Sequence, residues 1–78
     1  MEAYVLVNCD AGKSWSIAKS AQKFKSVKMA HAVTGQYDVV AFIDFKDMNM
    51  LADILEEFQT VKGVRRTHTA VAIPQKLE

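Results

Sequence analysis

The stretch Val-Thr-Gly-Gln-Tyr-Asp-Val-Val, residues 33–40, separates two apolar runs and decides how the chain folds. A β-forming run arrives at Val33, and a second run begins at Tyr37 and continues to Phe45. Gly35 permits the positive φ that a tight turn often requires, so the stretch predicts a turn between two antiparallel strands. Most turns of this kind have no ligand, so a plain hairpin and a hairpin with a binding site both stay open.

Upstream of the turn, the sequence predicts a strand, a helix and a second strand. Residues 3–9 are apolar at nearly every position, so we expect this strand to be buried on both faces. Ser14 is a candidate cap for a helix that runs to about Lys25. Residues 27–34 alternate between a more apolar and a more polar face, which is typical of a strand near a sheet edge. The more apolar face comprises Val27, Met29, His31 and Val33.

Downstream of the turn, the pattern repeats as a strand, a helix and a strand. Residues 37–45 are again apolar on both faces. Asp47 or Asn49 can cap a helix whose apolar residues between 51 and 61 recur at helical spacing, and Gly63 occupies the place of a C-terminal cap. A last strand then runs to Pro74. Its two alternating faces comprise Arg65, Thr67, Thr69, Val71 and Ile73 on one side and Arg66, His68, Ala70 and Ala72 on the other.

This order of elements predicts one α+β domain over residues 1–78 with a ferredoxin-like βαββαβ fold. In that arrangement the first and third strands lie at the centre of a four-stranded antiparallel sheet, and both helices cover one face. The two strands that are apolar on both faces are the ones that the fold places at the centre. Because the second face also needs cover, we expect a sheet-to-sheet dimer, a dimeric α/β sandwich or barrel.

Composition excludes several classes of function for these 78 residues. Ten Lys and Arg against nine Asp and Glu give a formal net charge of +1, and no basic run is present. Nucleic-acid binding depends on such cations, so we expect no direct contact with nucleic acid. We also expect no membrane partner and a cytoplasmic location, because no segment is long and apolar enough to span a bilayer. The single cysteine, Cys9, is interpreted as a small buried hydrophobe.

Sequences that imitate catalytic or metal motifs do not complete them. Gly12-Lys13-Ser14 imitates a phosphate-binding loop, but the position that needs its first glycine is Val7. Metallochaperones of the same strand order use a Cys-x-x-Cys pair where this chain has residues 10–13, Asp-Ala-Gly-Lys. His31 and His68 are far apart in the sequence. We therefore expect no catalytic residue, no metal and no cofactor.

Two motifs carry a family resemblance. Residues 33–38 match the pattern Val-x-Gly-x-Tyr-Asp, and residues 63–69 match Gly-Val-x-x-Thr-x-Thr. The opening Ala-Tyr-Val-Leu-Val-Asn, residues 3–8, is similar to stand-alone members of the same family. The whole chain thus resembles the amino-acid-binding RAM domain of the Lrp/AsnC, or feast-or-famine, transcription regulators. The resemblance implies a ferredoxin-like fold, a sheet-to-sheet dimer, assembly of dimers into larger rings such as octamers, and free amino acids bound where dimers meet.

The resemblance also implies a set of ligand-binding residues. Asp38 would accept from the α-ammonium, while backbone N–H groups of the loop and two threonine hydroxyls would donate to the carboxylate, and Tyr37 would form a wall. The plain alternatives are that the threonines are ordinary strand residues and that Asp38 only caps the turn. The expected site comprises Gly35, Gln36, Tyr37, Asp38, Thr67 and Thr69. Since dimers would each supply half of it, an isolated dimer is expected to bind weakly.

One departure from the full-length regulators shapes the expected function. Those proteins carry a helix-turn-helix domain before the matching part, whereas here the first strand follows Met1 almost at once. We therefore expect an amino-acid-sensing and oligomerisation module, not an enzyme, that acts through assembly with itself or with a full-length DNA-binding regulator. The alternatives are a dimeric α/β-barrel enzyme using His31 or His68, and an ACT-like regulatory domain, which Gly12 alone supports.

Overall fold

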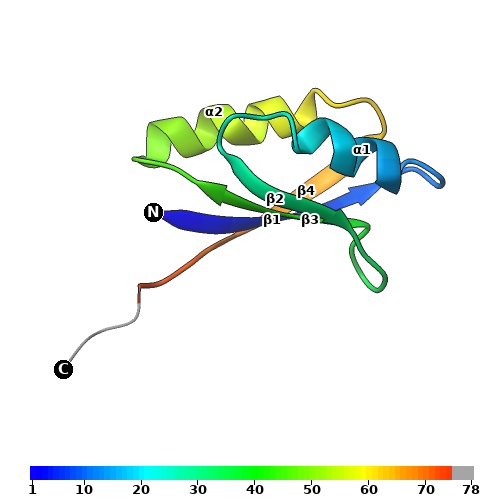
Figure 1. Cartoon of the computed structure of the whole chain (residues 1–78), viewed down its shortest axis with the longest axis horizontal. Coiled ribbons are helices and arrows are strands. Elements are labelled where there is room, and N and C mark those ends of the chain that lie inside the picture. Colours follow the sequence, from blue (N-terminus) through cyan, green and yellow to red (C-terminus); the bar gives the residue numbers. More distant parts are fainter. Residues whose placement is uncertain (75–78) are drawn as a thin grey trace.

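The computed structural model describes residues 1–74, and their elements follow the predicted order (Figure 1). The sheet order is β2-β3-β1-β4 with antiparallel pairing throughout, so β1 and β3 are the central strands. The predicted ferredoxin-like βαββαβ fold is therefore confirmed. The elements are β1 (Glu2–Cys9), α1 (Ser14–Ala21), β2 (Val27–Ala32), β3 (Val39–Asp44), α2 (Met48–Gln59) and β4 (Val64–Val71).

The core lies between the sheet and the two helices. Side chains of a strand alternate between faces, and Ala3, Val5 and Val7 of β1 are fully buried on the helix side. The T-shaped contact between Phe24 and Phe58, with ring centroids 5.2 Å apart, joins the segment after α1 to α2. The remaining core residues are Ile17, Ala18, Ala21, Ala30, Val39, Ala41, Ile43, Phe45, Leu51 and Ile54.

Helix α1 is shorter than its sequence pattern predicts. The helix ends at Ala21 and not near Lys25. Phe24 N donates to the carbonyl of Ala21, three residues back, at 3.0 Å, so the chain tightens into turns there. This turn directs the partly buried Phe24 ring toward the fully buried Phe58 ring.

The two helix caps differ in how well the sequence predicts them. Asp47 caps α2 as expected, and its Oδ1 accepts a hydrogen bond from Met50 N at 2.9 Å. Ser14 as a cap of α1 is wrong, because Lys13 holds the N-cap position and its side chain makes no capping bond. Neither helix within residues 1–74 is long and apolar enough to cross a membrane.

Strand β2 lies at a sheet edge as predicted, but the prediction of its faces is wrong. Ala30 is buried against the helices, whereas Met29 is 38% exposed and His31 is also exposed. A register shift between Val27 and Met29 interrupts the alternation on which the prediction depended. Gln22, the residue that follows α1, donates from Nε2 to the Ala30 carbonyl at 2.8 Å and so fastens the end of α1 to β2.

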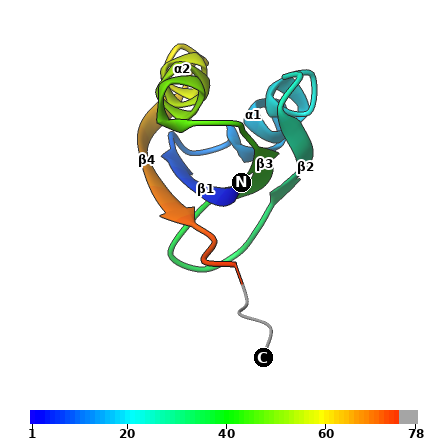
Figure 2. The ribbon, with the colours of Figure 1, turned by 90° about the vertical axis from the view of Figure 1, so that its left-hand side faces the viewer.

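The face of the sheet opposite the helices is apolar at its centre. Figure 2 shows both helices on one side of the curved sheet, with the β2–β3 loop passing on the other side. On that side the Tyr4 and Phe42 rings lie 4.9 Å apart and Tyr4 remains 43% exposed. We call this surface the open sheet face. Its members are Tyr4, Leu6, Met29, Val40 and Phe42.

Candidate functional site

The loop between β2 and β3, residues 33–38, folds back onto β1. Its ends close through Val33 N donating to the Asp38 carbonyl at 2.9 Å, and Asp38 N donates to the carbonyl of Val7 at 2.8 Å. Gly35 has φ of 113°, the positive value that its place in the sequence predicts. Since β3 begins at Val39, Tyr37 and Asp38 belong to the loop and not to the strand, contrary to the expectation for residues 37–45.

The side chains of the loop and of β1 hold one another. Asp38 Oδ2 accepts a hydrogen bond from Cys9 N at 2.8 Å, and Asn8 Nδ2 donates to the carbonyl of Gln36 at 2.7 Å. Both Asn8 and Asp38 are half-buried. The loop is thereby fixed to the end of β1 in a defined position, which a site that must present a carboxylate to a ligand requires.

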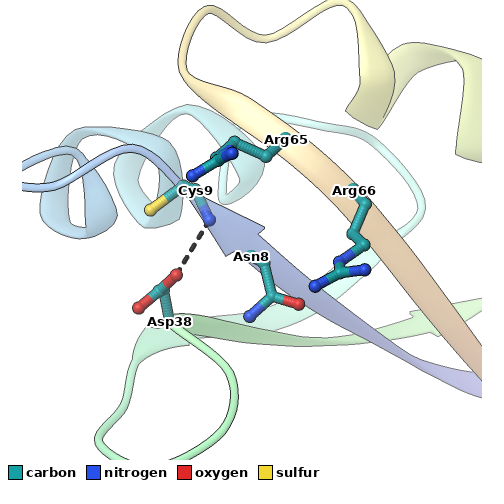
Figure 3. A pocket seen from close by; sticks show the side chains of 5 residues that line it. All are labelled: Asn8, Cys9, Asp38, Arg65 and Arg66. Carbon is teal, nitrogen blue, oxygen red and sulfur yellow. Dashed lines mark hydrogen bonds between the residues drawn. The ribbon is translucent and has the colours of Figure 1, made fainter.

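A pocket of about 470 Å³ opens beside these contacts (Figure 3). The end of β1 forms its floor, with the Asp38 carboxylate at one side and the two arginine side chains of β4 at the other. Its volume falls within the range of small-molecule sites. The lining residues are Asn8, Cys9, Asp38, Arg65 and Arg66.

The pocket combines charges of both signs. Asp38 supplies a carboxylate, and Arg65 and Arg66 supply guanidinium groups. Arg65 Nε also lies 3.8 Å from Asp10 Oδ1, but the two side chains are 71% and 61% exposed. An exposed pair of this kind contributes about 0–1 kcal/mol, so it leaves the arginine available to a stronger partner.

The Cys9 thiol in this pocket is held in its neutral form. Burial, followed by the charge of Asp38, raises the pKa of the Cys9 thiol above its usual value. A thiol with a raised pKa is a poor nucleophile near neutral pH. Within residues 1–74, no group of three or more His, Cys, Asp or Glu side chains is arranged to hold a metal ion.

The structure brings together only part of the predicted site. Tyr37 packs on His68 of β4, with ring centroids 5.4 Å apart at 64°. Thr67 pairs with Val7 and Thr69 with Val5, so both threonines lie on the helix side of the sheet. His68 alternates to the opposite side with Tyr37. In one chain, Gly35, Gln36, Tyr37 and Asp38 therefore form a cluster that Thr67 and Thr69 do not join.

The residues that sequence reasoning misses come from two strand ends. The sequence pattern assigns Asn8 and Cys9 only to the first strand, and it places Arg65 and Arg66 on opposite faces of the last strand. A shift in register between β1 and β4 at Asn8/Cys9 brings both arginines to one pocket. The one indication in the sequence is that Arg65 and Arg66 are adjacent and form its densest basic spot.

The chain is similar to one family model, to known regulators and to solved structures. The model of the Lrp/AsnC ligand binding domain matches residues 2–78. The HTH-type transcriptional regulator FL11 of Pyrococcus horikoshii is 32% identical over 73 residues, which are 94% of this chain and 48% of that protein. The crystal structure of TTHA0845 from Thermus thermophilus is 27% identical with a TM-score of 0.89, and the match covers 99% of this chain and 98% of that one.

A third relative is an enzyme. Homocitrate synthase of Saccharolobus islandicus is 31% identical over 74 residues, but these are 94% of this chain and only 16% of the enzyme. The likeness is therefore to one segment of that enzyme, while the chain spans about half the length of FL11. The family match extends over both motifs, residues 33–38 and 63–69, and confirms the resemblance read from them. The chain belongs to the family of Lrp/AsnC ligand-binding domains of transcription regulators.

Proposed function

We propose that this domain binds a free amino acid in the pocket beside Asp38. The observation that carries the proposal is the placement of opposite charges, with the Asp38 carboxylate on one wall and Arg65 and Arg66 on the other. A zwitterion presents an ammonium group to acceptors and a carboxylate to donors, so it matches both walls at once.

Each member of the loop has a part in this proposal. Cys9 N occupies Oδ2 of Asp38, which leaves Oδ1 to accept from the ammonium group. Gly35, Gln36 and Tyr37 do not line the pocket of their own chain, and the Tyr37 ring packs on His68, so these residues would border the ligand only where a neighbouring chain encloses it. The Gln36 carbonyl already accepts from Asn8, so the loop is ordered before a ligand arrives.

Assembly completes the pocket in this proposal. Thr67 and Thr69 lie on the far side of their own sheet from Tyr37, so they would contribute only to the pocket of a neighbouring chain. The open sheet face, with Tyr4 43% exposed against Phe42, is a suitable surface for a sheet-to-sheet dimer. Dimers then meet at the loops, and a higher oligomer such as an octamer encloses the ligand.

The consequence of binding is proposed to be regulatory. A segment similar to this chain makes up 48% of the HTH-type regulator FL11 of Pyrococcus horikoshii and 16% of homocitrate synthase of Saccharolobus islandicus. A segment attached to such different proteins is best explained as an effector-binding module. This domain would act on regulation by associating with itself or with a full-length DNA-binding relative. The effector would shift the balance between these assemblies by the difference in its affinity for them.

A thermal-shift screen against the twenty amino acids, run beside light scattering, tests the proposal. A ligand at 100 times its Kd stabilises the folded state by about 2.7 kcal/mol. For a domain of this size that raises the Tm on the order of 10 °C. A selective rise for a few amino acids supports the proposal. If all twenty leave the Tm unchanged at millimolar concentration, the proposed function is wrong.

The assembly part has its own test. Phe42→Asp places a charge on the open sheet face, and we expect light scattering to report a smaller species than for the parent at the same concentration. Lys46→Gln, an exposed position at the far end of the sheet, serves as the control. A Phe42→Asp protein that keeps the size of the parent would contradict the sheet-to-sheet dimer. Native mass spectrometry of mixtures with a full-length Lrp/AsnC regulator tests mixed assembly.

A further inference from the structure

The pairing of β1 with β4 contains an irregularity at the pocket. Asn8 pairs with Arg66, but Cys9 pairs with Val64, so Arg65 is an extra residue opposite the end of β1. In a regular strand two consecutive side chains point to opposite faces. A β-bulge breaks that alternation and redirects a side chain. Here Arg65 and Arg66 both line one pocket (Figure 3).

The bulge gives the pocket one cation more than a simple amino acid needs. The charges of a neutral amino acid are matched by Asp38 and a single arginine. Arg65 has an exposed neighbour in Asp10, with 3.8 Å between Nε and Oδ1. Among residues 1–74, no carboxylate lies within 4.0 Å of the Arg66 guanidinium. When a ligand and a neighbouring chain enclose the pocket, the second guanidinium needs a partner.

We infer that the effector is an acidic amino acid, whose side-chain carboxylate pairs with the second guanidinium of the Arg65–Arg66 pair. This inference rests on the proposed function and names the ligand class for the same pocket. The ammonium group lies on Asp38, and the two carboxylates of aspartate or glutamate take one arginine each. Guanidinium groups suit this role because they bind a carboxylate through two parallel hydrogen bonds.

The charges of the other lining residues, Asn8, Cys9 and Asp38, are compatible with an acidic amino acid. Asn8 Nδ2 already donates to the Gln36 carbonyl, and Figure 3 shows the Asn8 amide oxygen on the side of Arg66, so Asp38 is the acceptor for the ammonium group. Burial and the Asp38 charge raise the pKa of the Cys9 thiol, so it adds no negative charge against a ligand with two carboxylates. A dicarboxylate without an amine leaves Asp38 without a cation, and the Asp38 charge opposes a simple inorganic anion.

Calorimetric titration of the whole chain with aspartate, glutamate, asparagine, glutamine and glutarate tests the inference. We expect one of the two acidic amino acids to bind at least about tenfold more tightly than its own amide, the size of one charge-assisted contact. Glutarate, which lacks the ammonium group, is expected to bind at least about tenfold more weakly than glutamate. Equal affinity for acid and amide overturns the inference while leaving an amino-acid effector in place.

Two variants test whether the arginines cause the preference for an acidic amino acid over its amide. Arg66→Gln and Arg65→Gln are expected to reduce the ratio of acid to amide affinity about tenfold, and Lys46→Gln, which removes a cation from the far end of the sheet, to leave it unchanged. Thermal melts verify that each variant is folded. A preference that survives in both arginine variants overturns the inference, as does glutarate binding as tightly as glutamate. If no amino acid binds the parent at all, the proposed function fails and this inference fails with it.

Discussion

Asp38 has one observed role and one proposed role, and a pair of substitutions separates them. Its Oδ2 fastens the β2–β3 loop to β1 by accepting from Cys9 N at 2.8 Å, and its charge is proposed to hold the ammonium group of an amino acid. Asp38→Asn retains an oxygen that can accept from Cys9 N but removes the charge. Asp38→Ala removes both, so the two variants are expected to differ in stability and to agree in ligand binding.

The structure sets the expected magnitudes. A hydrogen bond to a charged group contributes about 1.5–3 kcal/mol, and Asp38→Ala also leaves the part-buried Cys9 N–H without its partner. We expect Asp38→Ala to lower the Tm on the order of 10 °C. Asp38→Asn exchanges a charged for a neutral bond, at a cost of about 1 kcal/mol and a few degrees. Either change removes the contact to the ammonium group and weakens binding about 10- to 100-fold.

Melting curves followed by circular dichroism measure the first effect, and calorimetric titration with the tightest-binding amino acid measures the second. Asp53→Asn, the same change of charge on the exposed side of α2, is the matched control and should alter neither. If Asp38→Asn binds every amino acid as tightly as the parent, Asp38 only fastens the loop. If Asp38→Ala melts with the parent, the fastening role is refuted.

The remaining predictions concern Gly35, Gly63 and Cys9. Gly63→Ala should cost about 1–3 kcal/mol in urea unfolding, because φ is 98° and a Cβ there would lie 3.1 Å from Lys13 Cγ. Gly35→Ala should cost about 1–2 kcal/mol from its φ of 113° alone, since no atom lies within 4 Å of the added Cβ; an equal or larger loss than at Gly63 would contradict this order. The folded state raises the pKa of Cys9, so the stability that its neutral thiol contributes is lost as the pH rises through that raised pKa, and Cys9→Ala should flatten the fall in Tm above about pH 8.5. Iodoacetamide should modify Cys9 slowly at pH 7.5 and faster in Asp38→Asn; a parent rate equal to that of a free thiol would contradict the raised pKa.

The sequence predicts the fold well where side-chain pattern and burial agree. Strands β1 and β3 carry apolar residues on both faces, and the sheet order β2-β3-β1-β4 places both at the centre. The pattern fails at β2, where the register shift between Val27 and Met29 and the small Ala30 decide which face meets α1. A period-two pattern contains no information about such a shift, because the shift depends on how two strands and a helix pack.

The sequence likewise predicts one part of the candidate site and not the other. The loop around Asp38 is visible in the sequence because Gly35 must adopt a positive φ and because Tyr-Asp follows it in a recognisable motif. The arginines are not assignable, because strict alternation places Arg65 and Arg66 on opposite faces and only the bulge at Cys9 reunites them. The same alternation, correctly applied, separates Thr67 from the loop of its own chain.

Strand β1 connects the pocket to the surface proposed for assembly. Its last residues, Asn8 and Cys9, line the pocket and hold the loop, while Tyr4 and Leu6 of the same strand lie on the open sheet face. In the proposed function, an amino acid bound by Asp38 would contact the same strand that a partner sheet would cover. The free energies of binding and association would then be linked: if the ligand strengthens association by some factor, association strengthens ligand binding by the same factor. Such coupling would require the effector to bind the free and associated forms with different affinities, and β1 is the element through which both sets of contacts would act.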